Sequence, residues 1–159
     1  MSHPDTVNVL IDRERTRTRP GRVFLDRDVF LIAPTRHGPV GRTLGAWSNA
    51  LFAHLPEELG LYDPFAVSRS EATNNPETVR VRYGDVEAMA PGVRPTGFSL
   101  HLRIARRPDE IRLGFRSNEE RRELLLLSRA IRDRANAAGT EVDLFEPKGR
   151  TRLVSLTED

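Results

Sequence analysis

The chain contains no cysteine among its 159 residues, and Lys148 is the single lysine among its 25 basic residues. Without cysteine there are no disulfide bonds, thiol nucleophiles or cysteine-ligated metals, which is compatible with a reducing compartment. No apolar run approaches the ~20 residues that a membrane-spanning helix requires. The N-terminus also lacks the basic start and the apolar core of a secretory signal. The sequence therefore predicts a cytoplasmic protein without a transmembrane segment.

Motifs that would identify a reaction are missing as well. The four histidines are scattered and none has the spacing of a metal site. The chain has no glycine-rich phosphate loop, no dinucleotide fingerprint and no nucleophile elbow. We therefore expect no catalytic residue, no metal and no cofactor, and a protein that is not an enzyme.

Arginine is the residue in excess. It supplies every basic residue except Lys148, while 23 acidic residues leave a formal net charge of only +2. Guanidinium groups stay charged and bind carboxylates and phosphates bidentately, which would suit an anion-binding protein. The same excess also follows from codon bias in a GC-rich genome. The near balance of acids and bases favours this plainer explanation.

The last third of the chain has the clearest local pattern. Residues 99–105 and 110–115 alternate apolar and polar side chains, which predicts two half-buried strands. Ser117 and Glu120 have the spacing of a capping box, and Gly139 is a typical helix stop. A helix is therefore expected from Ser117 to Gly139. Its apolar stripe should pack on the core of the domain and consists of Leu124, Leu127, Ile131, Ala135 and Ala138.

Further strands are predicted earlier in the chain, at 6–11, 22–26, 29–33, 78–83 and 86–90. Pro20-Gly21 and Pro91-Gly92 should end extended segments, and the polar stretch 68–76 should be a loop. A short helix is expected in the long connection at 43–66, and weak strands at 141–145 and 151–155. The fold class is therefore mainly β with a C-terminal α-helix (α+β). It has about seven strands in one domain at 1–139, followed by a polar tail or extra strand at 140–159.

The order of these elements resembles a known family. Residues 21–34 are similar to the hairpin that opens GRAM and related bacterial pleckstrin-homology-like domains, and 81–86 are similar to a later strand and turn. The resemblance covers residues 6–138 and implies a bent barrel or sandwich of two sheets, with the helix plugging one open end. It implies a binding module for phospholipid headgroups, peptides or proteins. The insertion Thr43–Ala66 departs from the family, and its lysine-rich first loop has no lysine here.

Arginines form the first candidate site. In an extended segment, alternate residues share a face, so the four arginines between 13 and 19 should point the same way. Two more arginines lie at the tip expected between strands 99–105 and 110–115. These segments would meet an anionic lipid surface, a nucleic acid or an acidic partner, although ordinary solvated loops are the plainer explanation. The candidates are Arg13, Arg15, Arg17, Arg19, Arg106 and Arg107, with Arg103 close to the last two.

Apolar residues of the insertion form the second candidate site. They should cover the domain's own core or, as the second choice, a subunit interface; they are Trp47, Leu51, Phe52, Tyr62 and Phe65. The sequence as a whole favours a non-enzymatic, pleckstrin-homology-like interaction module or scaffold. Its expected ligand is a protein partner, a second copy of itself or an anionic surface. The alternative is a nucleic-acid-binding protein that uses its arginine-rich segments.

Overall fold

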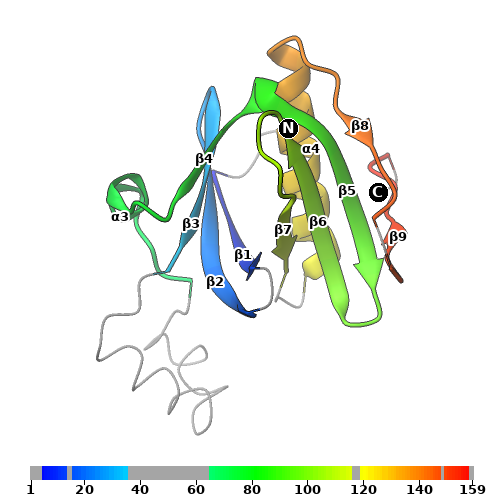
Figure 1. Ribbon diagram of the computed structural model, residues 1–159, viewed down its shortest axis with the longest axis horizontal. Coiled ribbons are helices and arrows are strands. Elements are labelled where there is room, and N and C mark those ends of the chain that lie inside the picture. Colours follow the sequence, from blue (N-terminus) through cyan, green and yellow to red (C-terminus); the bar gives the residue numbers. More distant parts are fainter. Residues whose placement is uncertain (1–4, 14–15, 36–64, 116–118, 148, 158–159) are drawn as a thin grey trace, which may run out of the picture.

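The computed structural model describes residues 5–13, 16–35, 65–115, 119–147 and 149–157 (Figure 1). Nine strands in these ranges form one sheet, which is antiparallel except where the short strand β8 (Asp143–Leu144) joins it. Besides the expected seven strands, the C-terminal tail adds two strands of two residues each, inside the segments 141–145 and 151–155 that the sequence predicts as weak strands. The class is mainly β with a C-terminal helix, as the alternation and the apolar stripe predicted. The helix expected at 43–66 falls almost entirely outside the described residues.

The first four strands form a meander that begins near the N-terminus. Hydrophobic alternation and the polar link at residues 26–28 produce the hairpin between the second and third strands, as predicted. The strands are β1 (Thr6–Arg13), β2 (Thr16–Leu25), β3 (Val29–Pro34) and β4 (Val79–Arg82).

The next three strands form a second meander. A short 3-10 turn, η1 (Tyr83–Asp85), leads from β4 into it, and β1 pairs with β7 to join the two meanders. The order across the sheet is β4-β3-β2-β1-β7-β6-β5-β8, and β9 also pairs with β5. The strands are β5 (Val86–Arg94), β6 (Gly97–Ile104), β7 (Ile111–Gly114), β8 (Asp143–Leu144) and β9 (Arg152–Leu153).

Helix α4 (Glu120–Ala137) packs against the inner face of β5 and β6 (Figure 1). Four of its five predicted stripe residues are buried, whereas Ala138 is exposed as the C-cap. Each buried leucine contributes ~1.5–3 kcal/mol relative to an exposed one. No helix in the described part of the chain is long and apolar enough to cross a membrane.

The helix ends where the sequence predicted but begins later. Gly139 adopts a φ of +86°, and the N–H of Thr140 donates to the carbonyl of Ala135 at 2.9 Å, the pattern of a Schellman stop. At the other end, Glu119 is the N-cap and makes no side-chain capping bond. Ser117, the predicted cap, lies outside the described residues.

Two proline–glycine pairs do not end strands, contrary to expectation. β2 runs through Pro20 and Gly21, which pair with Leu10 and Val9 of β1. A Cβ on Gly21 would collide with the Ile11 side chain, so glycine lets the strands pack closely there. β5 likewise continues through Pro91-Gly92 to its end at Arg94. Local turn propensity is overridden here by pairing with neighbouring strands.

The polar stretch predicted as a loop contains a helix, α3 (Arg69–Asn74). Ser68 caps it, and Glu71 returns the bond in a capping box, a signal that was present in the sequence. The helix covers the outer face of β2 and β3 through a second apolar cluster. That cluster consists of Phe24, Leu31, Ala33, Val67 and Ala72.

Candidate anion-binding surface

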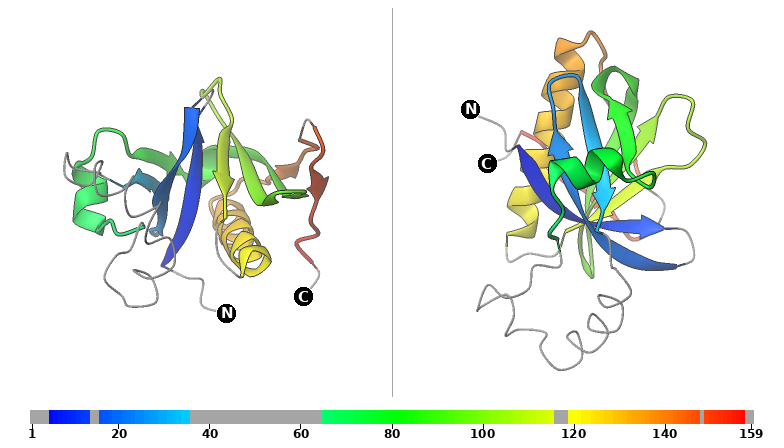
Figure 2. Two further views of the ribbon diagram at one scale, coloured as in Figure 1. Left: turned by 90° about the horizontal axis from the view of Figure 1, so that it is seen from below. Right: turned by 90° about the vertical axis from the view of Figure 1, so that its left-hand side faces the viewer.

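The end of β1 and the β6–β7 turn lie on the same side of the molecule. β1 pairs with β7 so that Asp12 lies opposite Arg112, which brings the end of β1 to the beginning of β7. The end of β1, the beginning of β2 and the β6–β7 turn therefore lie on one side, as both views in Figure 2 show. We call this side the hairpin face. Its described arginines are Arg103, Arg106, Arg107 and Arg112.

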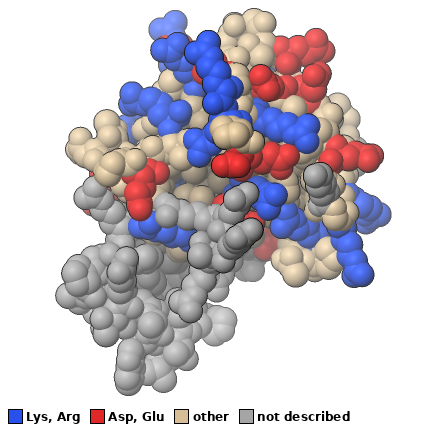
Figure 3. Space-filling model, viewed as in Figure 1, with Lys and Arg blue, Asp and Glu red and all other residues tan. Residues whose placement is uncertain are grey.

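The hairpin face carries only a small excess of positive charge, because acidic side chains lie between the basic ones (Figure 3). Residues 103–112 contain four arginines and two acidic residues, a local charge of +2. Figure 3 looks onto the face and shows basic side chains spread across it with acidic ones between them. Such a spread favours contact with an extended anionic surface over the enclosure of a small anion.

The tip of the β6–β7 turn holds Arg106 in an unusual backbone conformation. Its φ is +62°, and it is the one non-glycine residue with positive φ among those described. This conformation costs on the order of 1 kcal/mol for a residue with a Cβ. The turn is closed by the N–H of Arg107, which donates to the carbonyl of Ile104 at 3.2 Å. Both arginine side chains are exposed, so the strained backbone presents them to solvent.

Arg103 and Arg112 border a buried histidine on the outer face of β6. The imidazole of His101 is nearly inaccessible, and Arg94 Nη2 donates to its Nε2 at 2.5 Å. Its Nδ1 lies 3.6 Å from a carboxylate oxygen of Glu110, whose other oxygen accepts from Arg103 at 3.2 Å. Burial lowers the pKa of His101 below its usual value. Arg94 and, more weakly, Arg112 add to this lowering against the opposing pull of Glu110.

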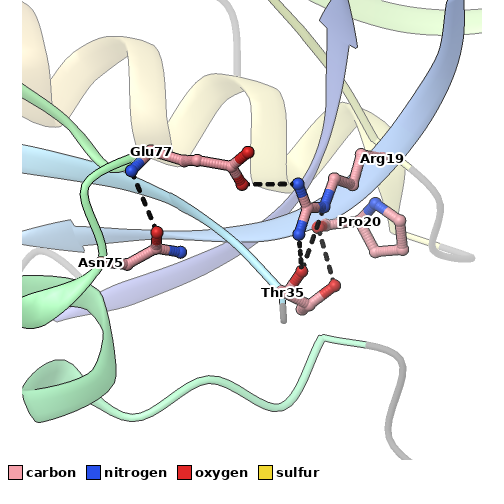
Figure 4. Close-up of polar contacts among 5 residues, drawn as sticks. All are labelled: Arg19, Pro20, Thr35, Asn75 and Glu77. Carbon is pink, nitrogen blue, oxygen red and sulfur yellow. Dashed lines mark hydrogen bonds and ion pairs between the residues drawn. The ribbon is translucent and has the colours of Figure 1, made fainter. Parts of the chain in front are cut away.

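Arg19, a predicted anion ligand, is partly buried and bonded to other parts of the fold (Figure 4). The carbonyl of Pro20 accepts the N–H of Thr35 at 3.0 Å, but proline has no N–H to donate in return. Arg19 Nε donates to the Thr35 carbonyl instead, at 3.0 Å, and its Nη2 makes a second bond. Nη1 bonds Glu77 at 2.7 Å. The guanidinium thus replaces a missing sheet hydrogen bond and ties β2 to the segment before β4.

The remaining predicted residues are placed only in part. The backbone sets Arg13 opposite Thr16 across the β1–β2 turn, and Arg17 lies on β2. Phe65 is partly buried just before α3. Arg15 and four of the insertion candidates fall outside the described residues; these four are Trp47, Leu51, Phe52 and Tyr62.

A second internal arginine joins the end of α4 to the β2–β3 turn. Arg134 Nη1 donates to the Asp26 carbonyl at 2.6 Å and to the Tyr83 hydroxyl at 2.7 Å. That hydroxyl donates to the same carbonyl at 2.9 Å. Burial raises the pKa of Tyr83, and the bond from Arg134 partly offsets the rise. The sequence gave no indication of this contact, because its partners lie 51 and 108 residues from Arg134.

Within the described ranges, no three histidine or acidic side chains lie close enough to hold a metal ion. No protein-family model and no curated protein sequence matches the chain. Among solved structures, the hSac2 domain from human phosphoinositide phosphatase Sac2 matches with a TM-score of 0.50. The match has 13% identity and covers 98% of this chain and 86% of that one. The two share a fold. At this identity the likeness concerns the fold alone.

Proposed function

We propose that this protein is a non-catalytic, pleckstrin-homology-like interaction module whose hairpin face binds an anionic membrane surface. The observation that carries the proposal is the conformation of Arg106. A glycine at that position would avoid the backbone strain, yet the chain places a long cationic side chain there, beside the exposed Arg107. Strain retained at an exposed charged tip indicates a role for the side chain outside the fold.

Strand order supports the pleckstrin-homology-like part of the proposal. Two meanders, β1–β4 and β5–β7, are joined by the pairing of β1 with β7. β5 pairs on its other side with β8 and β9 instead of β4, and α4 contacts η1 where β4 and β5 part. We infer a bent barrel that is open between β4 and β5 and plugged there by α4. The resemblance of residues 21–34 and 81–86 to GRAM-type domains supports the same architecture.

The structural neighbour is compatible with a lipid-related role. Its name places it in a phosphoinositide phosphatase, an enzyme that acts on anionic lipids. At the membrane surface each arginine contributes ~1 kcal/mol of attraction to anionic headgroups, so a few exposed arginines give weak, salt-sensitive binding. The local charge of +2 on residues 103–112 fits this regime.

Cosedimentation with vesicles tests the proposal. Neutral phosphatidylcholine vesicles are compared with vesicles that contain phosphatidylserine or a phosphoinositide at matched total charge. We expect binding to both anionic sets at low salt and loss of binding as salt rises. A preference for the phosphoinositide would identify a phosphorylated headgroup as the ligand, whereas equal binding would identify surface charge alone. Failure to bind either anionic set would exclude this function.

A matched pair of variants locates the interaction. Removing both tip arginines in Arg106→Gly/Arg107→Ala should weaken binding about 30-fold, since ~2 kcal/mol of attraction is lost. Arg80→Ala/Arg82→Ala removes two exposed arginines from the edge strand β4, which is four strands away from β7 in the sheet order, and should change binding less than 3-fold. Equal effects of the two pairs would contradict a role specific to the hairpin face.

Nucleic-acid binding remains the second candidate from the arginine content. A duplex and a single-stranded oligonucleotide are titrated under the same salt series. Affinity for nucleic acid falls steeply with salt because counterions are released. Oligonucleotide binding that is lost in Arg106→Gly/Arg107→Ala, without vesicle binding, would replace the membrane with a nucleic acid as the ligand.

A further inference from the structure

The outer edge of β5 is covered by the chain's own C-terminal tail, residues 140–147 and 149–157. β8 pairs with β5 in parallel, and the N–H of Phe145 donates to the Met89 carbonyl at 3.1 Å. β9 pairs antiparallel further along, and the N–H of Val154 donates to the Pro91 carbonyl at 2.9 Å. Each of these strands has two residues, whereas β5 has nine. Backbone pairing alone therefore holds the tail weakly.

Side chains of the tail fit three fixed places on the body of the protein. The guanidinium of Arg103 lies 3.8 Å from the centre of the Phe145 ring. Thr151 lies against Gly92, where any Cβ would overlap its methyl group. Leu156 is buried in the main core, and its carbonyl accepts from Arg129 Nε at 2.8 Å. We call these three places the tail seat. The seat is complementary to this particular tail sequence.

The link between α4 and the tail makes few contacts. Ala138, Gly139 and Glu141 are exposed, and a Cβ on Gly139 would meet nothing within 4 Å. Thr140 is held by one bond from its hydroxyl to the Gly84 carbonyl at 3.0 Å, besides its bond to the helix end. A change of backbone confined to this link would therefore allow the tail to leave its own seat and to make the same contacts in the seat of another copy. The two large exposed apolar residues of the described chain, Leu144 and Leu153, both lie on the tail.

We propose that the tail exchanges between two copies of this chain, so that the tail of one copy occupies the seat of the other. The tail of a second copy fits the seat as the chain's own tail does, because it carries the aromatic ring, the small β-branched residue and the buried leucine at the same spacing. Reciprocal exchange retains every seat contact, and only the link changes its conformation. The exchange involves neither Arg106 nor Arg107, so it is independent of the anion-binding role. An exchanged dimer would present two hairpin faces and so gain avidity for a membrane.

Two variants that damage opposite halves of the contact test the exchange. Leu156→Asp spoils the tail and leaves the seat intact, whereas Gly92→Val fills the seat and leaves the tail intact. Each variant alone should be monomeric by native mass spectrometry. An equimolar mixture should form a 1:1 heterodimer, in which the intact tail of the Gly92→Val chain enters the intact seat of the Leu156→Asp chain. Leu153→Asp places the same charge at an exposed tail position and, mixed with Gly92→Val, should form no heterodimer.

A peptide covers the case in which Gly92→Val does not fold, which circular dichroism would reveal. A fluorescent peptide that copies residues 149–157 should bind Leu156→Asp at least 10-fold more tightly than the unmodified protein, in which the tail competes. Two folded variants that form no heterodimer would overturn the proposal. Peptide binding without a heterodimer would also overturn it, because the seat would then belong to an extended segment of another protein.

Discussion

Arg19 and Arg106 carry the same guanidinium group in opposite surroundings. At the end of β3, Arg19 donates to the Thr35 carbonyl, to which Pro20 has no N–H to offer, and it also bonds Glu77. At the β6–β7 tip, Arg106 is exposed on a backbone that would suit glycine better. Arginine therefore stabilises the fold at a position where proline cannot donate a sheet hydrogen bond. It remains available for a ligand where the backbone directs it outward.

Removing the Arg19 side chain should have the largest effect on the stability of the fold. Arg19→Ala removes two guanidinium bonds to the Thr35 carbonyl and the ion pair with Glu77, and we expect a loss of ~2–3 kcal/mol in the free energy of unfolding. For a chain of this size, that loss corresponds to a fall in Tm of roughly 4–12 °C. Urea denaturation followed by circular dichroism measures it.

A second substitution tests whether Arg19 replaces the hydrogen bond that Pro20 cannot donate. Pro20→Ala restores a backbone N–H opposite the Thr35 carbonyl, so Arg19→Ala/Pro20→Ala should recover more than half of the lost stability. If the double variant is as unstable as Arg19→Ala alone, Arg19 does not act as a substitute for the missing sheet bond.

Arg94 is in a third environment. Its acceptor is Nε2 of His101, and protonation of that nitrogen would abolish the hydrogen bond. The pKa of His101 is lowered in the folded protein, so the unfolded chain binds a proton more readily. Stability should therefore be complete above the unfolded pKa of about 6.5 and should fall as the pH drops below it, by at most ~1.4 kcal/mol per pH unit. His101→Gln keeps an acceptor for Arg94 and should flatten this part of the profile, measured by urea denaturation between pH 7.5 and 5.0. An unchanged slope would exclude His101 as its source.

The smallest effect is expected at the tip. Arg106→Gly relieves the positive φ and should leave the free energy of unfolding equal or up to ~1 kcal/mol higher. The same denaturation experiment measures it beside Arg19→Ala. Destabilisation by more than 1 kcal/mol would place Arg106 with the structural arginines and remove the main support for a ligand role.

Hydrophobic patterns predicted most of the fold. The hairpin of β2 and β3, the strands β6 and β7 and the buried stripe of α4 all follow from the spacing of their apolar residues. Residues 68–76 were misread because their polarity outweighed the capping box of Ser68 and Glu71. Pro20-Gly21 was misread because turn propensity is local, whereas strand continuation depends on partners 10 residues or more away.

Of the predicted arginines, the sequence placed Arg106 and Arg107 correctly at an exposed hairpin tip, but it did not indicate that Arg19 is engaged by the fold. Alternation and turn residues placed arginines at strand ends, and the pairing of β1 with β7 brings those ends to one side. Which arginines are free depends on register, since the acceptor of Arg19 is a backbone carbonyl present in every residue type. A sequence pattern marks no such acceptor. The Arg94–His101 and Arg134–Tyr83 contacts were missed for the same reason.

Periodicity and composition are carried by the residues directly, so they are enough to predict a mainly β protein with a C-terminal helix, without disulfide bonds and rich in arginine. They do not predict which arginines bond to other parts of the fold and which are exposed at the β6–β7 tip, nor that the tail pairs with the edge of β5. Both outcomes depend on hydrogen-bonding groups of the main chain, which are identical along the sequence. They acquire partners only when the strands are in register.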